Sequence, residues 1–600
     1  MNPFKVIYSY FSVYRKYVGS RFYVIFTLTL LAVTTEGFGL ALLLPMISQL
    51  GIASVDAMDS GFTSFINGLL DWIGIKGSVT GMLVFIAIIF LIKGILKFCE
   101  GVYKAKLKSS LMRDLRSELF DAYATMDYRY YIQHNAGHFV NLINVQIGNF
   151  VGSFDQFVRF LISLITVAAY FLFAFLVSWE FASMALIFGG GVLLLFRRLN
   201  RYVRKMSQLT VNELGILNHF IVQAMQTFKY IASTGQVEPL RNAILKSNKH
   251  LTKCLRHQDI AIAFTQAIRE PFSIIVLLGI IVIQFVFFKA DLAPILVSLL
   301  LIYRAIGYVF TLQTAWQRTM GMVGSLEILE KEFEDTKIHK QNSGDVTIQP
   351  LKKGIELKNV SFSYDVKNGD VLKNISMFIP ANKTVALVGE SGSGKSTLVD
   401  LLTLLLKPTN GELLIDGVKI ESDMNLQSWR SQIGYVSQET VVFDDTIANN
   451  ISLWRGDYNQ DNDVKKDIEH VAEKTHIINF VKEMPDGFNA VVGDRGIRLS
   501  GGQCQRLFIA RELYKKPKLL ILDEATSSLD SESELIIKNS IDELHGETTV
   551  VIIAHRLSTI KNADYIYVLD NGNVAEQGTY QDLVDTEQGN FNRLVSLQKL

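Results

Sequence analysis

The sequence predicts two fold classes in one chain: an α-helical membrane domain with six long spans, followed by an α/β domain. Apolar residues crowd into the first half of the 600 residues, and the mean hydropathy is +0.24 with only 20 % charged residues. A glycine-rich phosphate-binding motif begins at Gly389, and an apolar strand at 519–524 ends in two carboxylates. We therefore expect a membrane domain at 1–330, a linker at 331–354 and an α/β domain at 355–600.

Composition limits the compartment and the partners. The chain carries 59 Lys and Arg against 58 Asp and Glu, a net charge of +1, which gives no global basis for a nucleic-acid partner. Its three cysteines, Cys99, Cys254 and Cys504, lie far apart without disulfide or metal spacing, which favours free thiols serving as small apolar fillers. No cleavable signal is expected, because the apolar sequence from Phe22 is too long for a signal core.

The first 79 residues predict three membrane-associated segments. Residues 1–21 mix cations with aromatic residues, which is typical of an interfacial helix on the cytoplasmic face. Residues 22–50 are long enough to span a bilayer, which takes about 20 apolar residues. Residues 51–79 have few cations and predict an amphipathic helix on the outer face, since apolar residues recur at helical spacing at Phe62, Phe65, Ile66, Leu69, Leu70 and Ile73.

Five further spans are predicted, at 81–98, 154–177, 181–196, 271–288 and 294–312. Charged helical sequence after the second and the fourth span predicts two long excursions into the cytosol. Basic residues collect in the N-terminal segment and in these excursions. By the positive-inside rule both termini are then cytoplasmic, and we expect a multi-pass protein of the inner membrane.

The phosphate-binding motif at 389–396 fits the pattern G-x-x-x-x-G-K-[ST], between an apolar strand and a helix. Its glycines let backbone N–H groups surround phosphate oxygens at a helix N-terminus. Lys395 can reach the β- and γ-phosphates, and Ser396 can offer its hydroxyl to Mg²⁺. A chance glycine turn is the weaker interpretation, because strand, loop and helix follow in order. The predicted nucleotide-binding residues here are Gly389, Ser391, Gly392, Gly394, Lys395, Ser396 and Thr397.

Two later motifs add candidate chemistry. Asp523 can hold Mg²⁺ and Glu524 can polarise the attacking water, unless they only form a solvated acidic turn. The turn Ser500-Gly501-Gly502-Gln503 opens a helix whose N–H groups can meet a γ-phosphate, although Ser500 can also be a simple N-cap. The loop at Lys395 already encloses its own phosphate, so this turn suggests a composite site between two subunits.

Residues 355–590 resemble the nucleotide-binding domain of ATP-binding cassette (ABC) transporters, because the three motifs match the family's phosphate loop, signature and magnesium strand in order. The resemblance implies that Tyr364 stacks on adenine, that Gln438 senses Mg²⁺ and water, and that His555 contacts the γ-phosphate. Residues 527–530 would cross to the partner, and residues 493–496 would touch the membrane domain.

The six spans resemble the type I exporter half-transporter arrangement, which implies ATP and Mg²⁺ as cofactors, a homodimer and alternating access. Coupling helices would lie near 128–133 and 226–233, the second docking on the partner's cassette. Three positions depart from the family pattern: Asn382, Cys504 and Glu512. None removes a catalytic group, and intact motifs favour a homodimer with two working sites.

Ionisable residues inside spans are candidate substrate residues, because each costs about 2.5–3.5 kcal/mol at mid-membrane unless paired or hydrated. They are Glu36, Lys93, Arg159 and Arg304. Snorkelling near a helix end is an equal alternative for Lys93 and Arg159. Glu36 and Arg304 are the predicted substrate residues, and a cationic cavity would suit an anionic amphiphile.

The stretch 36–45 and the outer amphipathic helix resemble the lipid-linked oligosaccharide flippases. We therefore expect an ATP-driven exporter or flippase that moves an amphiphile, a glycolipid or lipid-linked oligosaccharide, outward from the cytoplasmic side. Export of peptides or lipophilic drugs is the alternative. A regulatory cassette that gates a channel is disfavoured by the intact Glu524, and a soluble role in DNA maintenance is disfavoured by six spans.

Overall fold

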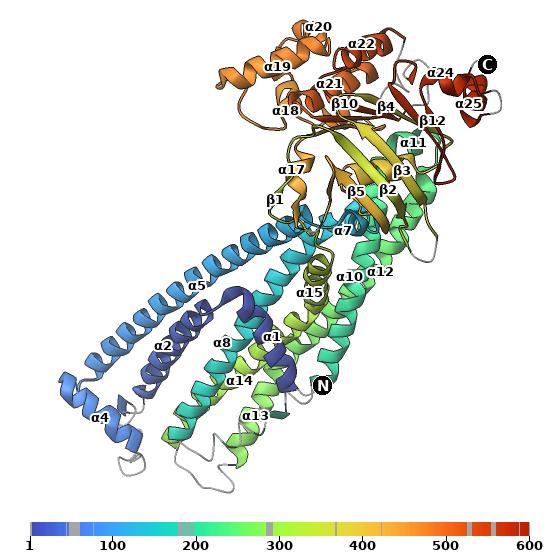
Figure 1. Ribbon diagram of the computed structural model, residues 1–600. Coiled ribbons are helices and arrows are strands. Elements are labelled where there is room, and N and C mark those ends of the chain that lie inside the picture. The colour runs from blue at the N-terminus through green and yellow to red at the C-terminus, as the bar shows by residue number, and fades with distance from the viewer. Residues whose placement is uncertain are drawn as a thin grey trace. The chain divides into compact units, whose positions relative to one another are not determined.

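The computed structural model describes residues 3–43, 45–46, 61–75, 77–177, 183, 187, 190–191, 196–283, 292–365, 369–421, 423–524, 531–553, 560–586 and 589–598 (Figure 1). The chain divides into two compact units. The helical unit comprises Met1–Met126 and Tyr131–Lys340, and the sheet unit comprises Asp127–Tyr130 and Gln341–Leu600. Each unit is described by itself.

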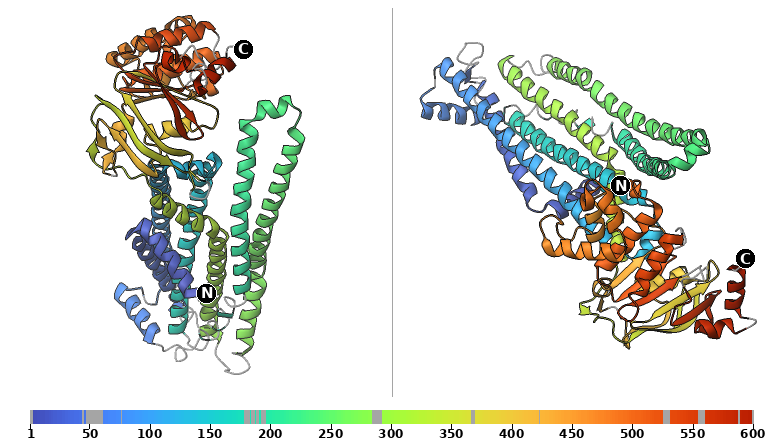
Figure 2. Two further views of the ribbon diagram at one scale, coloured as in Figure 1. Left: turned by 45° about the vertical axis from the view of Figure 1, so that its right-hand side comes forward. Right: turned by 90° about the horizontal axis from the view of Figure 1, so that it is seen from above.

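The helical unit consists of long helices joined by short ones. Helices α10 and α12 form an antiparallel pair closed by α11 (Figure 2). The elements are α1 (Pro3–Val18), α2 (Arg21–Ala41), α4 (Gly61–Ile73), α5 (Val79–Ala124), α6 (Tyr128–Ile132, shared with the sheet unit), α7 (Ala136–Asn141), the π-helical η2 (Leu142–Gln146), α8 (Ile147–Val177), α10 (Arg197–Gln226), α11 (Phe228–Ser233), α12 (Val237–Ala267), α13 (Arg269–Ile283), α14 (Leu292–Gly321) and α15 (Val323–Ile338).

Four helical stretches among the described residues are long and apolar enough to cross a membrane: Arg21–Ala41, Val79–Ala124, Ala136–Leu176 and Val237–Gly279. They include the expected second and third spans, most of the first and the start of the fifth. The sixth expected span corresponds to α14. The fourth expected span lies almost wholly outside the described residues.

Helix α5 shows how the sequence carries one helix from lipid into water. The Ser78 hydroxyl caps its start by accepting a hydrogen bond from Gly81 N–H at 3.1 Å. In its most apolar stretch only 6 % of the residues are buried in the protein, as expected for a lipid-facing helix. Further along, leucines recur every four residues and pack into the core, at Leu107, Leu111, Leu115 and Leu119.

An aromatic cluster fixes α1 to the rest of the helical unit. Tyr14 is fully buried, and its hydroxyl donates a hydrogen bond to Ser153 Oγ at 2.8 Å. Its ring meets those of Phe150 and Phe154 edge to face at 5.4 and 5.5 Å. The predicted interfacial helix therefore buries one face in protein. Helix α4 occupies the expected amphipathic segment, with Leu70 buried and Trp72 88 % exposed.

The sheet unit is built on a six-stranded sheet in the order β12-β11-β4-β10-β9-β8, parallel except for β12. Alternate residues of β4 face two cores, with Ala386 and Val388 on one side and Val385 and Leu387 on the other. A second, antiparallel sheet has the order β3-β2-β5-β6. Both faces of the parallel sheet are covered, which explains why its strands read as continuous apolar runs.

The strands are β1 (Val346–Thr347), β2 (Gly354–Phe362), β3 (Leu372–Pro380), β4 (Thr384–Gly389), β5 (Asn410–Ile415), β6 (Val418–Lys419), β7 (Met424–Asn425), β8 (Ile433–Val436), β9 (Leu519–Asp523), β10 (Thr549–Ile553), β11 (Tyr565–Asp570) and β12 (Asn573–Gly578). The helices are α16 (Lys395–Leu402), α17 (Leu426–Arg430), α18 (Ile447–Ser452), α19 (Asn462–Lys474), α20 (Ile478–Glu483), α21 (Gly501–Tyr514), α22 (Ser531–Asp542), α24 (Tyr580–Val584) and α25 (Asn590–Gln598).

The segment 331–354, expected as a linker, is divided between the two units at Lys340 and Gln341. Its first part is the end of α15, which stays helical because Phe333 and Thr336 are buried in the helical unit. Its second part joins the sheet unit, where β1 pairs in parallel with β7. The apparent polarity of the stretch comes from the exposed residues between these buried ones.

The sheet unit also takes in Asp127–Tyr130, which overlaps the first expected coupling helix. Tyr128 packs against its core, and the Arg129 guanidinium lies 5.0 Å from the centre of the Phe362 ring. Arg129 also donates a hydrogen bond to the Lys407 carbonyl oxygen at 3.4 Å. In the second expected coupling segment, α11 has no buried residue.

Gly37 lets α2 approach α8, and its replacement gives a first prediction. A Cβ atom at Gly37 would lie 2.1 Å from Phe173 Cε2. Gly37→Ala should therefore destabilise the protein by about 1–3 kcal/mol through overpacking. Gly94→Ala on α5 is the control, since a Cβ there meets no heavy atom within 4 Å. Thermal unfolding in detergent should show a lower midpoint temperature for Gly37→Ala and an unchanged one for Gly94→Ala. Equal midpoints for the two variants would contradict this packing.

Candidate functional site

The phosphate-binding motif forms the loop between β4 and α16. Gly394 has a φ of +102°, and a Cβ atom there would lie 2.6 Å from Leu372 Cδ2. Only glycine meets both conditions. The loop closes on the Lys395 ammonium group, which donates hydrogen bonds to the carbonyl oxygens of Gly389 and Glu390, each at 2.8 Å. The result is a ring of backbone around one cation at a helix N-terminus.

The charges and donors of this loop fit a phosphate group. Burial lowers the pKa of Lys395, and the carboxylates of Glu524 and Asp523 oppose that shift. The Ser393 hydroxyl oxygen is buried and has no hydrogen-bond partner among the described residues. A phosphate oxygen would supply the acceptor that Ser393 lacks, and its charge would favour the ammonium form of Lys395.

Carboxylates meet at the end of β9. Gln438, which follows β8, donates a hydrogen bond from Nε2 to Glu524 Oε2 at 2.7 Å. Glu524 has a φ of +50°, in the left-handed region that non-glycine residues adopt only rarely. Asp523 is 8 % exposed and accepts a hydrogen bond from the Tyr435 hydroxyl at 3.4 Å. Burial, with the charge of Asp523, raises the pKa of Asp400 on α16 to about 6.

These oxygen ligands are of the kind that Mg²⁺ prefers. Ser396, Gln438 and Asp523, which the sequence predicts as Mg²⁺ ligands, stay the candidate residues to hold it. Sequence reasoning did not single out Asp400, whose carboxyl group is affected by the charge of Asp523. The sequence could have identified Asp400, because it is an acidic residue five positions after Lys395 in the helix that follows the phosphate-binding loop.

Two further predicted nucleotide contacts are Tyr364, near the phosphate-binding loop at 389–396, and Ser500, in the turn 500–503. Tyr364 is 40 % exposed, packs edge to face on Phe362, and places its hydroxyl 3.3 Å from Thr397 Oγ1. Ser500 is the N-cap of α21: its Oγ accepts the Gln503 N–H, and Gln503 Oε1 accepts the Ser500 N–H. The N-cap interpretation is thus confirmed, and a γ-phosphate contact stays a prediction. His555 and residues 527–530 lie outside the described residues.

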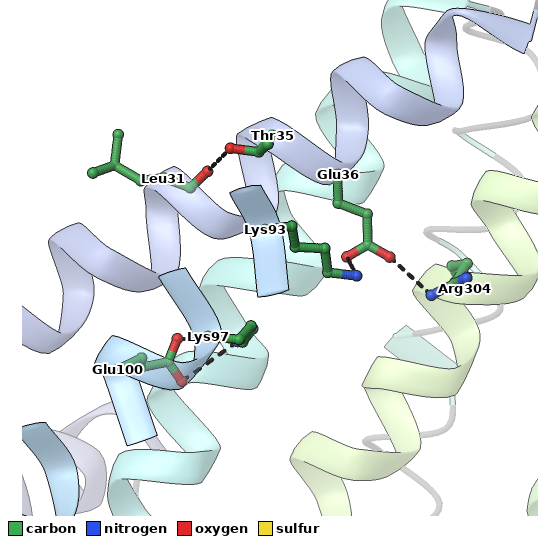
Figure 3. A network of polar contacts seen from close by, with 7 residues as sticks. All are labelled: Leu31, Thr35, Glu36, Lys93, Lys97, Glu100 and Arg304. Carbon is green, nitrogen blue, oxygen red and sulfur yellow. Dashed lines mark hydrogen bonds and ion pairs between the residues drawn. The ribbon is translucent and has the colours of Figure 1, made fainter. Parts of the chain in front are cut away.

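The helical unit contains a buried carboxylate shared by two cations (Figure 3). Glu36 on α2 is 1 % exposed. Its Oε2 lies 2.7 Å from Lys93 Nζ on α5, and its Oε1 accepts a hydrogen bond from Arg304 Nη1 on α14 at 2.8 Å. The snorkelling interpretation of Lys93 is therefore wrong, because the side chain turns to Glu36 rather than to a helix end.

A second buried carboxylate lies on α5, the helix that carries Lys93. Glu100 is 7 % exposed, pairs with Lys97 at 3.0 Å and accepts a hydrogen bond from the Thr29 hydroxyl at 3.1 Å. Sequence reasoning missed it, because the second span was taken to end before Glu100. The available signal was spacing, since Lys93, Lys97 and Glu100 lie on one helical face.

Arg304 also faces a cavity. Its side chain is 40 % exposed and lines a space of about 700 Å³ together with Arg269 and Glu270. Gly307 makes room for the second guanidinium, since a Cβ there would lie 3.2 Å from Arg269 Nη2. A second space of about 340 Å³ shares Arg269 and Glu270. The charged residues lining the two spaces are Arg159, Arg269, Glu270, Arg304 and Arg318, so the lining is cationic.

Both halves of the chain match known sequence families. The family described as ABC transporter matches residues 372–527, and the ABC transporter transmembrane region matches residues 46–306. The ATP-dependent lipid A-core flippase of Haemophilus influenzae is 32 % identical over 90 % of this chain and 92 % of its own. The chain belongs to the ABC transporter family. It is therefore an ATP-hydrolysing transporter, and the predicted family, fold class and ATP-driven activity are confirmed.

Two further relatives and one solved structure are similar over most of the chain. The lipid A-core flippase of Coxiella burnetii is 30 % identical over 92 % of this transporter and 93 % of its own length. The heterocyst differentiation ATP-binding protein HepA of Nostoc sp. is 33 % identical over 81 % and 79 %. A bacterial Atm1-family ABC exporter with ATP bound shares the fold, with a TM-score of 0.80, 21 % identity and coverage of 97 % and 98 %.

The ATP site gives the second prediction. Lys395→Ala should weaken ATP binding by about tenfold or more, the loss expected for a charged hydrogen bond to phosphate. Glu524→Gln should still bind ATP but hydrolyse it about 10²- to 10⁴-fold more slowly, because it cannot accept the proton of the attacking water. Nucleotide titration and phosphate release measure the two effects. Lys407→Ala, an exposed lysine beyond α16, is the control. Near-normal turnover by Glu524→Gln would exclude Glu524 as the base.

Proposed function

We propose that this ABC transporter flips an anionic amphiphile, a glycolipid or lipid-linked oligosaccharide, from the inner to the outer leaflet. The observation that carries this proposal is the cationic cavity at Arg269 and Arg304 within the helical unit. Glu36 balances only one of the two cations that contact it, Lys93 and Arg304, and an excess cation in a span is costly unless water or a ligand's negative charge compensates it. The flippase names of the relatives support a lipid cargo, and Leu70 and Trp72 give α4 the two faces of a helix lying in a leaflet.

Glu36 serves as the internal counter-charge of this site. It balances one of its two partners, Lys93 and Arg304, so the three side chains together carry one excess positive charge. Arg304 is the partner that reaches the cavity. An anionic headgroup can take Arg304 from Glu36 while Lys93 keeps the buried carboxylate paired, which avoids leaving a bare charge.

ATP hydrolysis supplies the energy. Lys395 and the loop around it bind the phosphates, and Tyr364 supports the adenine. Asp523, Ser396 and Gln438 hold Mg²⁺, which neutralises phosphate charge when bound. Glu524 orients and deprotonates the attacking water, and His555 contacts the γ-phosphate. Gly501, Gly502 and Gln503 act with Ser500 on the nucleotide held by a second copy of this chain, in a homodimer of the inner membrane with both termini in the cytoplasm.

The third prediction tests the cargo. Arg304→Ala in liposomes should reduce ATP-dependent exposure of a labelled polyprenyl-pyrophosphate glycan by about tenfold or more, as expected for the loss of one charged hydrogen bond. The variant should still fold, because Lys93 continues to pair with Glu36. Arg116→Ala, an exposed arginine on the charged part of α5, is the control and should flip normally.

Two results would redirect the cargo proposal. Glycan flipping by Arg304→Ala at the unaltered rate would remove Arg304 from the substrate path. Uptake of peptides or lipophilic dyes into inside-out vesicles, without glycan movement, would favour a drug or peptide exporter.

The fourth prediction concerns the composite ATP site. In a background without Cys99, Cys254 and Cys504, the pair Ser391→Cys and Ser500→Cys should crosslink between chains when ATP is bound. Ser391 is chosen because it is an exposed serine of the loop, whereas Ser393 is 4 % exposed. Differently tagged chains distinguish the products on a gel, and each single cysteine variant is a control. Crosslinks found only within one chain would contradict the shared site.

A further inference from the structure

A buried carboxylate lies at the end of the helical unit from which the chain passes into the sheet unit. Glu332 on α15 is 3 % exposed. Its Oε1 accepts a hydrogen bond from the Tyr123 hydroxyl at 2.9 Å, and its Oε2 lies 3.1 Å from His138 Nε2. Tyr123 is in the last turn of α5 and His138 in the first turn of α7. One carboxylate thus joins three elements of the helical unit.

Aromatic packing surrounds these contacts. The ring of Phe139 meets the Tyr123 ring edge to face at 4.9 Å, and the His134 ring lies 4.6 Å from that of His138. Asn135 extends the network to a fourth element, since its amide nitrogen lies 2.9 Å from His219 Nδ1 on α10. Hydrogen bonds to a carboxylate that is itself buried hold the groups that make them in one arrangement.

The network adjoins two places where the chain changes unit. The chain passes from the helical to the sheet unit after Met126 and again after Lys340. These two residues form an isolated antiparallel bridge. Tyr123 lies one turn before the first exit, and Glu332 lies about two turns before the second. Beyond the second exit Gln341 is fixed at once, because its Oε1 accepts a hydrogen bond from Arg430 Nη1 at 2.9 Å.

We propose that Glu332 is a positioning residue that couples nucleotide-driven movement to the spans, by holding these two exits as one body. If the chain segments at Met126 and Lys340 could move separately, a movement of the sheet unit would only rearrange these segments and would not reach the spans. Exits tied through Glu332 transmit it to α5, α7 and α15 together. The role differs from that of Glu327 on the same helix, which is partly exposed and pairs with Arg204.

The fifth prediction tests this coupling without knowledge of the cargo. The full-length protein in liposomes receives ATP, Mg²⁺ and vanadate, and two quantities are measured: ATP hydrolysis before trapping, and hydrogen exchange of α4 at the far end of the helical unit (Figure 1). Glu332→Ala should hydrolyse ATP at a rate close to that of the unaltered protein. Its nucleotide-dependent change in α4 exchange should fall by about tenfold, within the usual range of coupling between sites.

Matched variants separate coupling from stability. Glu334→Ala changes an exposed glutamate of the same helix and should respond normally. Glu332→Gln should restore the response, because its amide can still accept from Tyr123 and donate to a neutral His138. If Glu332→Ala does not fold, Tyr123→Phe and His138→Phe each remove one hydrogen bond to Glu332 and should each lose part of the response. An α4 response in these variants equal to that of Glu334→Ala would overturn the proposal.

Discussion

A carboxylate inside a membrane domain must be neutralised, and the arrangement of the spans around Glu36 follows from this constraint. Ionised and unpaired, it would cost several kcal/mol, whereas pairing recovers the cost only with good geometry on more than one side. Lys93 and Arg304 supply that geometry from two other helices. The same three side chains therefore hold α2, α5 and α14 in register and leave one cation in excess, which faces the cavity.

Helix α5 extends the same principle along its length. Lys93, Lys97, Glu100 and Lys104 lie three or four residues apart on one face, and Lys104 pairs with Asp155 of α8 at 3.0 Å. Each charge meets an opposite charge within the helical unit, so a helix of 46 residues can run from apolar to aqueous surroundings without a break. Away from these ion pairs, the first part of α5 exposes apolar residues. The later part buries its leucines and exposes polar residues. These ion pairs therefore stabilise the continuous helix, in addition to any part that they have in a substrate site.

How much the sequence could predict depends on the range of the interaction. The phosphate loop, the magnesium strand and the N-cap at Ser500 are local, since a few adjacent residues determine each one. The long spans follow from hydropathy over about 20 residues. The partners of Glu36 come from residues 57 and 268 positions away, and no local pattern selects them from the other intramembrane cations. The contacts of Glu332 could not be predicted for the same reason, because only tertiary packing brings Tyr123 and His138 to it.

The two interpretations of Ser500 are compatible once its atoms are considered separately. As N-cap it uses an oxygen lone pair to accept the Gln503 N–H at 3.2 Å. Its hydroxyl hydrogen is not used in that bond and remains available to an acceptor such as a phosphate oxygen. The first N–H groups of α21 likewise have no intrahelical acceptor, and the helix dipole favours an anion at this end. The capping box fixes the direction of these donors before any nucleotide arrives, so the cap itself prepares the turn for the phosphate that we assign to it.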